Sequence, residues 1–196
     1  MGNNVNLFIS NTSKSTKSLH ADDLALWRSL AKGNNLGFSS LYQRYANRLF
    51  NYGMHICYNR ELVKDCIQEL FTWIWNKRDE LTDVNSVKYY LFKSFRNILV
   101  KAINKDRKFT EEPGENHFLE QSVSKEEELM QRELESFQKA KISSALSKIT
   151  KRQREIVNLR FFNEMSYSEI AAIMGISIAS AHNLLSKALQ QLKEHI

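Results

Sequence analysis

The sequence has little of what interrupts helices or cross-links a small fold. One proline and six glycines occur in 196 residues, so long helices can run with few breaks. The two cysteines, Cys57 and Cys66, fall within apolar helical patterns and lack CxxC spacing. No disulfide scaffold is implied, and we expect both cysteines to be reduced core residues.

Signals of catalysis and of membrane insertion are also missing. The five histidines are scattered, and none pairs with Cys, Asp or Glu at a recognised metal-ligand spacing. Walker, GxGxxG and GxSxG motifs do not occur. We therefore predict no enzymatic activity, no metal and no cofactor. No apolar run is long enough to cross a bilayer, and the first residues lack a signal-peptide pattern, so we expect a cytoplasmic protein.

What the sequence does contain predicts an all-α protein with two helical domains. Apolar residues recur at helical spacing through most of the chain, and the formal charge of +6 favours a polyanionic partner. Residues 1–20, rich in Asn, Ser, Thr and Lys, are interpreted as a disordered tail. A four-helix domain is predicted over 21–108, with helices at about 21–33, 38–52, 61–77 and 86–105.

An acidic linker is predicted over 109–128. Residues 110–128 hold Pro113, Gly114 and seven glutamates against one lysine. Helical patterning resumes near Leu129, and we assign 129–196 to a second helical domain.

The second domain ends in the pattern of a helix-turn-helix. Ser166 and Glu169 form a capping box, Gly175 lies where a left-handed residue is needed, and Ser177 can cap the next helix. Small Ala171 allows the two helices to cross closely, and Ala181 and Leu184 are expected to face inward. This motif places its second helix in the DNA major groove. An ordinary helical hairpin is the alternative.

Outward positions on and beside the second helix are candidates for contacts with DNA. Amides and imidazoles can bind base edges, and cations can bind phosphates. The alternative is a solvated charged face. The candidates are Arg152, Arg154, Ser177, Ala179, Ser180, His182, Asn183, Ser186 and Lys187, with Lys148, Lys151 and Arg160 in the same basic flank.

The fourth helix of the first domain ends in a cluster of positive charge. Tyr89, Tyr90, Phe92 and Phe95 precede it, and aromatics beside cations are used to bind single-stranded nucleic acid. Aromatics at helical spacing are more often core residues, and we expect at least Tyr90 and Phe92 to be buried. The polar candidates on this helix and the tail that follows it are Arg96, Asn97, Lys101, Asn104, Lys105, Arg107 and Lys108.

One polar patch lies on the third helix, opposite its apolar stripe. Asp65, Gln68 and Glu69 are spaced at i, i+3 and i+4 and share a face. From the pattern alone, a plain solvent-facing surface is the favoured interpretation.

Motifs in both domains resemble those of the extracytoplasmic-function (ECF) sigma factors of bacterial RNA polymerase. The resemblance extends from about Asp22 to Ile196. The motifs that carry it are Phe38-x-x-Leu-Tyr-x-x-Tyr45, Asp65-x-x-Gln-Glu-x-Phe71 with Trp75, Tyr90-Leu with Arg96-Asn97, Gln153-Arg-Glu-Ile-Val-x-Leu-Arg160, Ser166-Tyr-Ser-Glu-Ile-Ala171 and Lys187-Ala188.

This resemblance implies partners and roles. Asp65, Gln68 and Glu69 would bind the clamp helices of the largest subunit of core RNA polymerase. The fourth helix, with Asp83, Asn85 and Ser86 in the loop before it, would recognise and open the −10 element of promoter DNA. The helix-turn-helix would read the −35 element, and an anti-sigma factor would hold the protein inactive.

Two other classes of function remain open. A stand-alone helix-turn-helix transcriptional regulator would use the Asp65 face as ordinary surface and would usually need a dimer to read two half-sites. A nucleic-acid-processing enzyme would need a metal or acid–base cluster, which the sequence does not offer.

Overall fold

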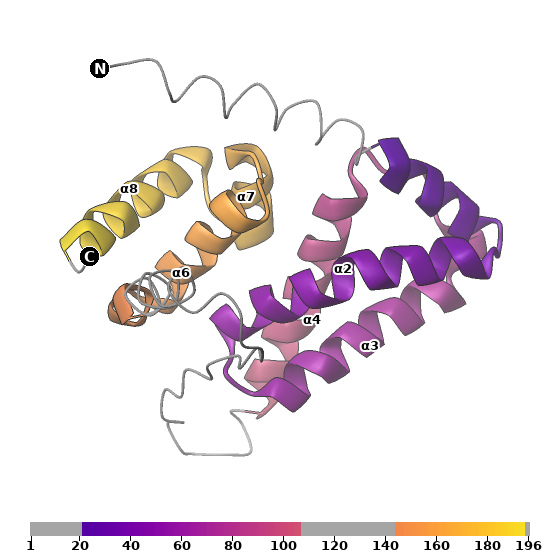
Figure 1. Cartoon of the computed structure of the whole chain (residues 1–196), viewed down its shortest axis with the longest axis horizontal. Coiled ribbons are helices and arrows are strands. Elements are labelled where there is room, and N and C mark those ends of the chain that lie inside the picture. Colours follow the sequence, from indigo (N-terminus) through magenta and orange to yellow (C-terminus); the bar gives the residue numbers. More distant parts are fainter. Residues whose placement is uncertain (1–20, 107–143, 195–196) are drawn as a thin grey trace, which may run out of the picture. The chain divides into compact units, whose positions relative to one another are not determined.

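The computed structural model describes residues 21–106 and 144–194, coloured in Figure 1. They form two compact units. The first lies within Met1–Asn51 and Glu61–Asn104, and the second within Tyr52–Arg60 and Lys105–Ile196. All regular elements in the described ranges are helices, which confirms the all-α prediction. The predicted N-terminal tail and acidic linker lie outside the described residues.

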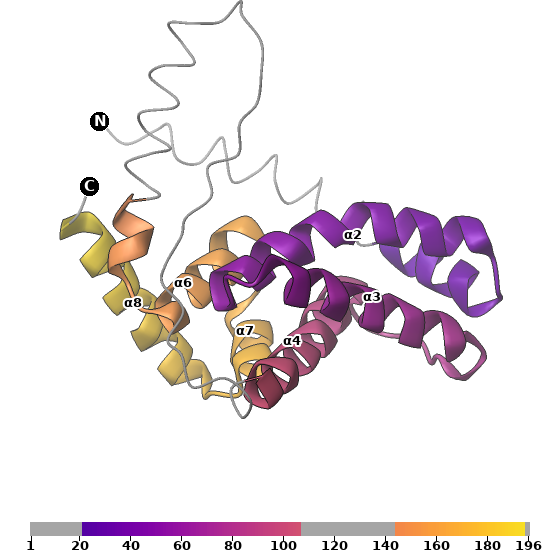
Figure 2. The same cartoon turned by 90° about the horizontal axis from the view of Figure 1, so that it is seen from below.

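Helices make up the first unit and its connections. Residues 21–31 are helical, and α2 and α3 lie side by side in both views (Figure 1, Figure 2). Apolar side chains at helical spacing explain this packing, and Trp27, Tyr45, Phe92 and Phe95 are almost completely buried. The elements are α2 (Asn35–Ile56), α3 (Arg60–Asn76), the 3₁₀ turn η1 (Arg78–Glu80) and α4 (Val87–Asp106).

A buried carboxylate ties the 21–31 helix to α2. Asp23 is 5% exposed and accepts hydrogen bonds from the Arg44 guanidinium and the Tyr45 hydroxyl. Burial, together with the bond to Asp23, raises the pKa of Tyr45. The phenol therefore remains protonated and continues to donate across the ordinary pH range.

Gly37 sets the distance between the same two helices. A Cβ added at Gly37 would lie 2.9 Å from both the Leu26 carbonyl oxygen and the Leu30 backbone nitrogen. Both atoms are backbone and cannot rotate away. Only glycine therefore permits this close crossing.

Gly37→Ala should lower the free energy of unfolding by about 1–3 kcal/mol, because overpacking forces the helices apart. Urea unfolding followed by circular dichroism measures this. Gln43→Ala on the exposed side of α2 is the control and should stay within about 0.5 kcal/mol of the wild type. Equal stability of Gly37→Ala would show that the crossing can relax.

The second unit contains the C-terminal helices. They are α6 (Lys151–Val157), the π-helical turn η2 (Asn158–Phe162), α7 (Tyr167–Met174) and α8 (Ile178–Glu194), preceded by a helical turn at 144–148. No single helix in the described ranges is long and apolar enough to cross a membrane. The pair α7 and α8 passes that test only together, with a 97° bend between them.

Candidate polymerase and DNA interfaces

One face of α3 carries the three polar residues singled out in the sequence. Its other face buries Val63, Ile67, Leu70 and neighbouring apolar residues, so Asp65, Gln68 and Glu69 are all exposed. They line an open depression of about 490 Å³ together with three residues that the sequence analysis did not select. We call the whole set the α3 patch: Asp65, Gln68, Glu69, Thr72, Trp73 and Asn76.

Trp73 gives the α3 patch an apolar centre. Its side chain is 49% exposed, although tryptophan usually buries most of its surface. It follows Glu69 by four residues, and that helical spacing is the signal that could have identified it. An exposed indole beside acids and amides offers a partner both apolar contact area and hydrogen-bond acceptors.

The acids of the α3 patch are available to cations of a partner. No ion pair joins Asp65 or Glu69 to another residue in the part of the chain that the structure describes. Behind the patch, Phe38 packs edge-on against Phe71 and Trp75, with ring centroids 6.0 and 5.1 Å apart. These contacts anchor α3 against α2 and so fix the patch.

The predicted cationic surface of α4 occupies one helical face. Asn97, Lys101, Asn104 and Lys105 are exposed, and their spacing places them together on a helix. Lys93 lies on the same face one turn earlier, where its ammonium donates to the Tyr89 hydroxyl at 2.9 Å.

One other predicted residue of this surface, Arg96, lies off that face. Arg96 is half-buried and lies about a quarter turn away. Arg107 and Lys108 lie outside the described residues.

The aromatics that precede this face do not all reach the surface. Phe92 and Phe95 have no exposed side-chain area, so stacking of bases on these two rings is ruled out and the core alternative holds for them. Tyr89 and Tyr90 are half-buried. The expectation of burial was therefore right for Phe92 and only partly met by Tyr90.

The loop before α4 holds the remaining candidates of the first unit. Asp83 and Asn85 are exposed. Ser86 caps α4 through its hydroxyl, which accepts from the Tyr89 backbone N–H at 3.2 Å. The cap fixes the end of the loop at the start of α4.

The helix-turn-helix geometry is present in the second unit. The Ser166 hydroxyl accepts from the Glu169 N–H, and the Glu169 carboxylate accepts from the Ser166 N–H, which confirms the capping box. Gly175 is left-handed with φ of 65°. The Ser177 hydroxyl accepts from the Ser180 N–H at 3.0 Å, which caps α8. The 97° bend falls within the range of this motif.

The faces of α8 divide as the sequence predicts, with one shift. Ala181, Leu185 and Ala188 are buried, whereas Leu184, expected to face inward, is only half-buried. Helical spacing from Ala181 explains the shift, because Leu185 is one turn further along. The DNA-facing residues predicted on α8 and at its cap are exposed: Ser177, Ala179, Ser180, His182, Asn183, Ser186 and Lys187.

A stack of side chains joins the start of α7 to this face. The His182 ring stacks on Tyr167 with centroids 3.5 Å apart, and the Arg160 guanidinium lies 5.0 Å from the Tyr167 ring centroid. Tyr167 was not among the predicted site residues. Its contact with His182 means that this imidazole is held in one orientation on the surface.

Arg154 does not belong to the basic flank, and its selection as a DNA-facing residue was wrong. Its guanidinium donates to the carbonyl oxygens of Leu146 and Ile149 at 3.2 and 3.0 Å, and the residue is 4% exposed. It therefore satisfies the orphan carbonyls at the end of the 144–148 turn. Lys148, Lys151 and Arg152 remain exposed.

Comparisons with protein families agree with both units. Residues 41–109 match the family model for Sigma-70 region 2, and residues 139–192 match Sigma-70, region 4. The ECF RNA polymerase sigma factor RpoE of Cereibacter sphaeroides is 24% identical over 183 residues, covering 92% of this chain and 98% of that protein. RNA polymerase sigma factor YlaC of Bacillus subtilis is 25% identical over 158 residues, covering 80% and 90%.

Solved structures with a similar fold include two protein complexes. The sigma factor RpoE with the anti-sigma factor NepR, from Bartonella quintana, has a TM-score of 0.62 at 20% identity, covering 80% of this chain and 94% of that one. CnrH with the cytosolic domain of CnrY has a TM-score of 0.59 at 20% identity, covering 88% and 95%. These likenesses establish the fold.

Proposed function

The chain belongs to the ECF sigma factors of bacterial RNA polymerase, a family of transcription-initiation factors, and on this premise we propose how its surfaces divide the work. The α3 patch binds the clamp helices of core polymerase. The loop before α4 and the cationic face of α4 recognise and open the −10 element. The exposed face of α8 reads the −35 element. The protein performs no chemistry itself.

One observation carries this proposal most directly. The α3 patch is an exposed, acidic and amide-bearing surface with a half-exposed Trp73, in a chain that also holds a complete helix-turn-helix. A regulator that binds DNA without polymerase would leave the Asp65 face as ordinary surface. A factor that must attach to a large partner would use it, because exposed tryptophans are common anchors of protein interfaces.

Domain boundaries and cellular location follow as parts of the same proposal. We assign 21–108 to a polymerase- and −10-binding domain, 109–128 to a linker, and 129–196 to a −35-binding domain. The protein acts in the cytoplasm, where core polymerase and promoters are found.

An anti-sigma factor is the expected regulator. Two solved structures of similar fold hold RpoE bound to NepR and CnrH bound to the cytosolic domain of CnrY. We extend this pairing to the present chain and place the inhibitor over the α3 patch. An inhibitor there competes directly with core polymerase.

Mapping transcript starts after overexpression tests the proposed function. Two short motifs shared upstream of the induced starts, near −10 and −35, are expected because the proposed factor has two DNA-reading surfaces. New starts with no shared upstream motif, or no new starts at all, would overturn it.

Asn183→Ala should weaken promoter-specific transcription and leave core binding intact. Asn183 is exposed near the N-terminal half of α8, where helix-turn-helix proteins contact bases. Loss of one amide–base contact reduces output roughly 5- to 150-fold, corresponding to about 1–3 kcal/mol.

Gln190→Ala is the matched control for Asn183→Ala. It removes an exposed amide from the same face of α8, about two turns further from the N-terminus. Multi-round transcription from a mapped promoter measures both variants. Equal output from Asn183→Ala and Gln190→Ala would rule out Asn183 as a reader.

A further inference from the structure

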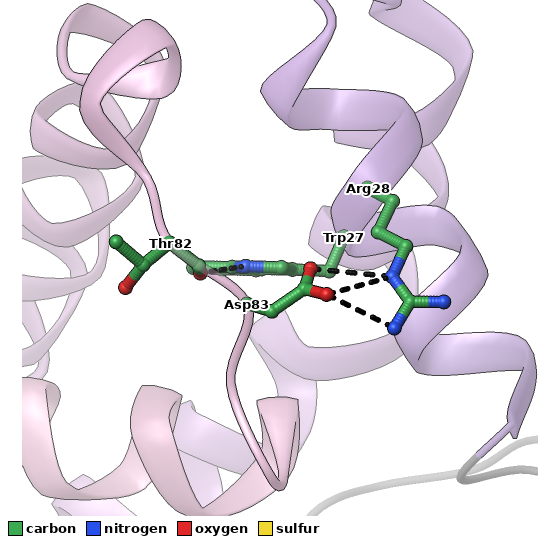
Figure 3. Close-up of polar contacts among 4 residues, drawn as sticks. All are labelled: Trp27, Arg28, Thr82 and Asp83. Carbon is green, nitrogen blue, oxygen red and sulfur yellow. Dashed lines mark hydrogen bonds and ion pairs between the residues drawn. The ribbon is translucent and has the colours of Figure 1, made fainter.

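The 21–31 helix holds the loop that precedes α4. The Trp27 indole N–H donates to the Thr82 carbonyl oxygen at 3.1 Å. Next to it, the Arg28 guanidinium donates hydrogen bonds to the Asp83 carboxylate (Figure 3). Nε lies 3.2 Å from both carboxylate oxygens, and Nη2 lies 3.0 Å from Oδ2. Two adjacent residues of one helix therefore hold two adjacent residues of the loop.

The supporting helix is itself firmly placed. Trp27 is 1% exposed and packs edge-on against Tyr90 of α4, with ring centroids 5.0 Å apart. Gly37 allows the close approach of α2 to the backbone of the same helix. The indole therefore reaches Thr82 from a rigid position rather than from a mobile surface.

The 82–86 loop is fixed at both of its ends, and its middle residues are left to face a partner. Thr82 and Asp83 are held by the 21–31 helix, and Ser86 is held by its capping bond to Tyr89. Only Val84 and Asn85 lie between these anchors. Asn85 is exposed there, and its amide can both donate to and accept from a base.

Charge gives the Arg28–Asp83 pair a second effect. A carboxylate in the loop that precedes α4 would repel DNA phosphates. Arg28 offsets this charge, and its forked geometry also fixes the direction of the Asp83 side chain. The pair is exposed, so its effect on overall stability is small. Its effect on the loop is local.

We propose that Trp27 and Arg28 are positioning residues for −10 recognition, which hold the 82–86 loop so that Asn85 meets the promoter in one orientation. This deepens the proposed function and rests on it. Asp83 acts mainly as the attachment point for Arg28 and not as a base reader. Loss of the Arg28–Asp83 pair therefore reduces discrimination between −10 sequences and leaves the binding of core polymerase unchanged.

A double-mutant cycle tests the proposal. The full-length chain is assembled with core polymerase as wild type, Arg28→Ala, Asp83→Ala and the double variant. Open complexes are measured on a mapped promoter and on duplexes carrying each single −10 substitution. Lys32→Ala is the control, because it removes an exposed charge from the segment just after the same helix.

We expect both single variants to reduce discrimination roughly tenfold, on the order of one well-placed base contact. The double variant should lose no more than either single variant, because the two residues act through one attachment. Arg28→Lys, which keeps the charge without the fork, should fall between wild type and Arg28→Ala. Lys32→Ala should discriminate as the wild type does.

Two results would overturn the inference. One is that Arg28→Ala and Asp83→Ala discriminate between −10 sequences as well as the wild type does. The other is that the double variant loses the sum of the discrimination lost by the two single variants. If the wild-type chain opens no promoter with core polymerase, the proposed function fails and this inference fails with it. Open-complex formation by the wild-type chain therefore distinguishes failure of the proposed function from failure of this inference alone.

Discussion

Trp73→Ala is expected to weaken binding of core RNA polymerase roughly 30-fold or more, because a tryptophan anchor in an interface is worth about 2 kcal/mol or above. Trp73 lies among the acids and amides of the α3 patch with half of its surface exposed. Replacing Asp65, Gln68 and Glu69 together by alanine should have a comparable effect. Fluorescence anisotropy with labelled protein and purified core enzyme measures both.

Controls for this prediction come from exposed residues of the same unit outside the α3 patch. Leu36 is 76% exposed on α2, so Leu36→Ala, like Trp73→Ala, removes an exposed apolar side chain. Asp79 and Glu80 in η1 match the loss of carboxylates. Leu36→Ala and the Asp79→Ala/Glu80→Ala pair should bind core normally. Wild-type affinity in the α3 patch variants would place the polymerase contact elsewhere.

Lys101→Ala with Lys105→Ala should impair promoter binding and opening while core binding persists. Both ammonium groups are exposed on the cationic face of α4. If each neutralises one phosphate of duplex DNA, the slope of log affinity against log salt becomes shallower by about 1.8. The expected loss of affinity is then roughly tenfold or more near 0.1 M salt.

Lys101→Arg with Lys105→Arg is the matched control, because it keeps both charges at the same positions. Permanganate reactivity of thymines in the −10 region reports opening directly. The prediction does not hold if the alanine pair retains the wild-type salt slope, or if the arginine pair loses as much as the alanine pair.

Local features were predictable because their causes are local in sequence. The caps at Ser166 and Ser177 and the left-handed Gly175 each depend on a few neighbouring residues, and all three are present as predicted. The exposed faces of α3 and α4 followed from helical spacing alone. Helix ends were less precise: α2 begins three residues before the predicted start and extends four beyond the predicted end.

Features that depend on contacts between distant residues could not be predicted. Arg154 lies in a run of basic residues typical of a DNA-binding flank. In the structure, however, its guanidinium donates hydrogen bonds to the backbone carbonyls of Leu146 and Ile149. Arg28 gave no sequence signal, since its partner Asp83 lies 55 positions away. Helical spacing predicts which face of a helix carries a charged side chain. It does not reveal whether that side chain is already bonded to another part of the protein.

Reconstituted transcription tests whether this chain directs initiation by core RNA polymerase. The purified chain, core RNA polymerase and a template carrying a mapped promoter are combined in a single-round assay. A transcript from the mapped start is expected only when the chain is present, and much less of it with the Trp73→Ala variant. If no transcript forms while the same core enzyme initiates normally with another sigma factor, the claim that this chain directs initiation is contradicted.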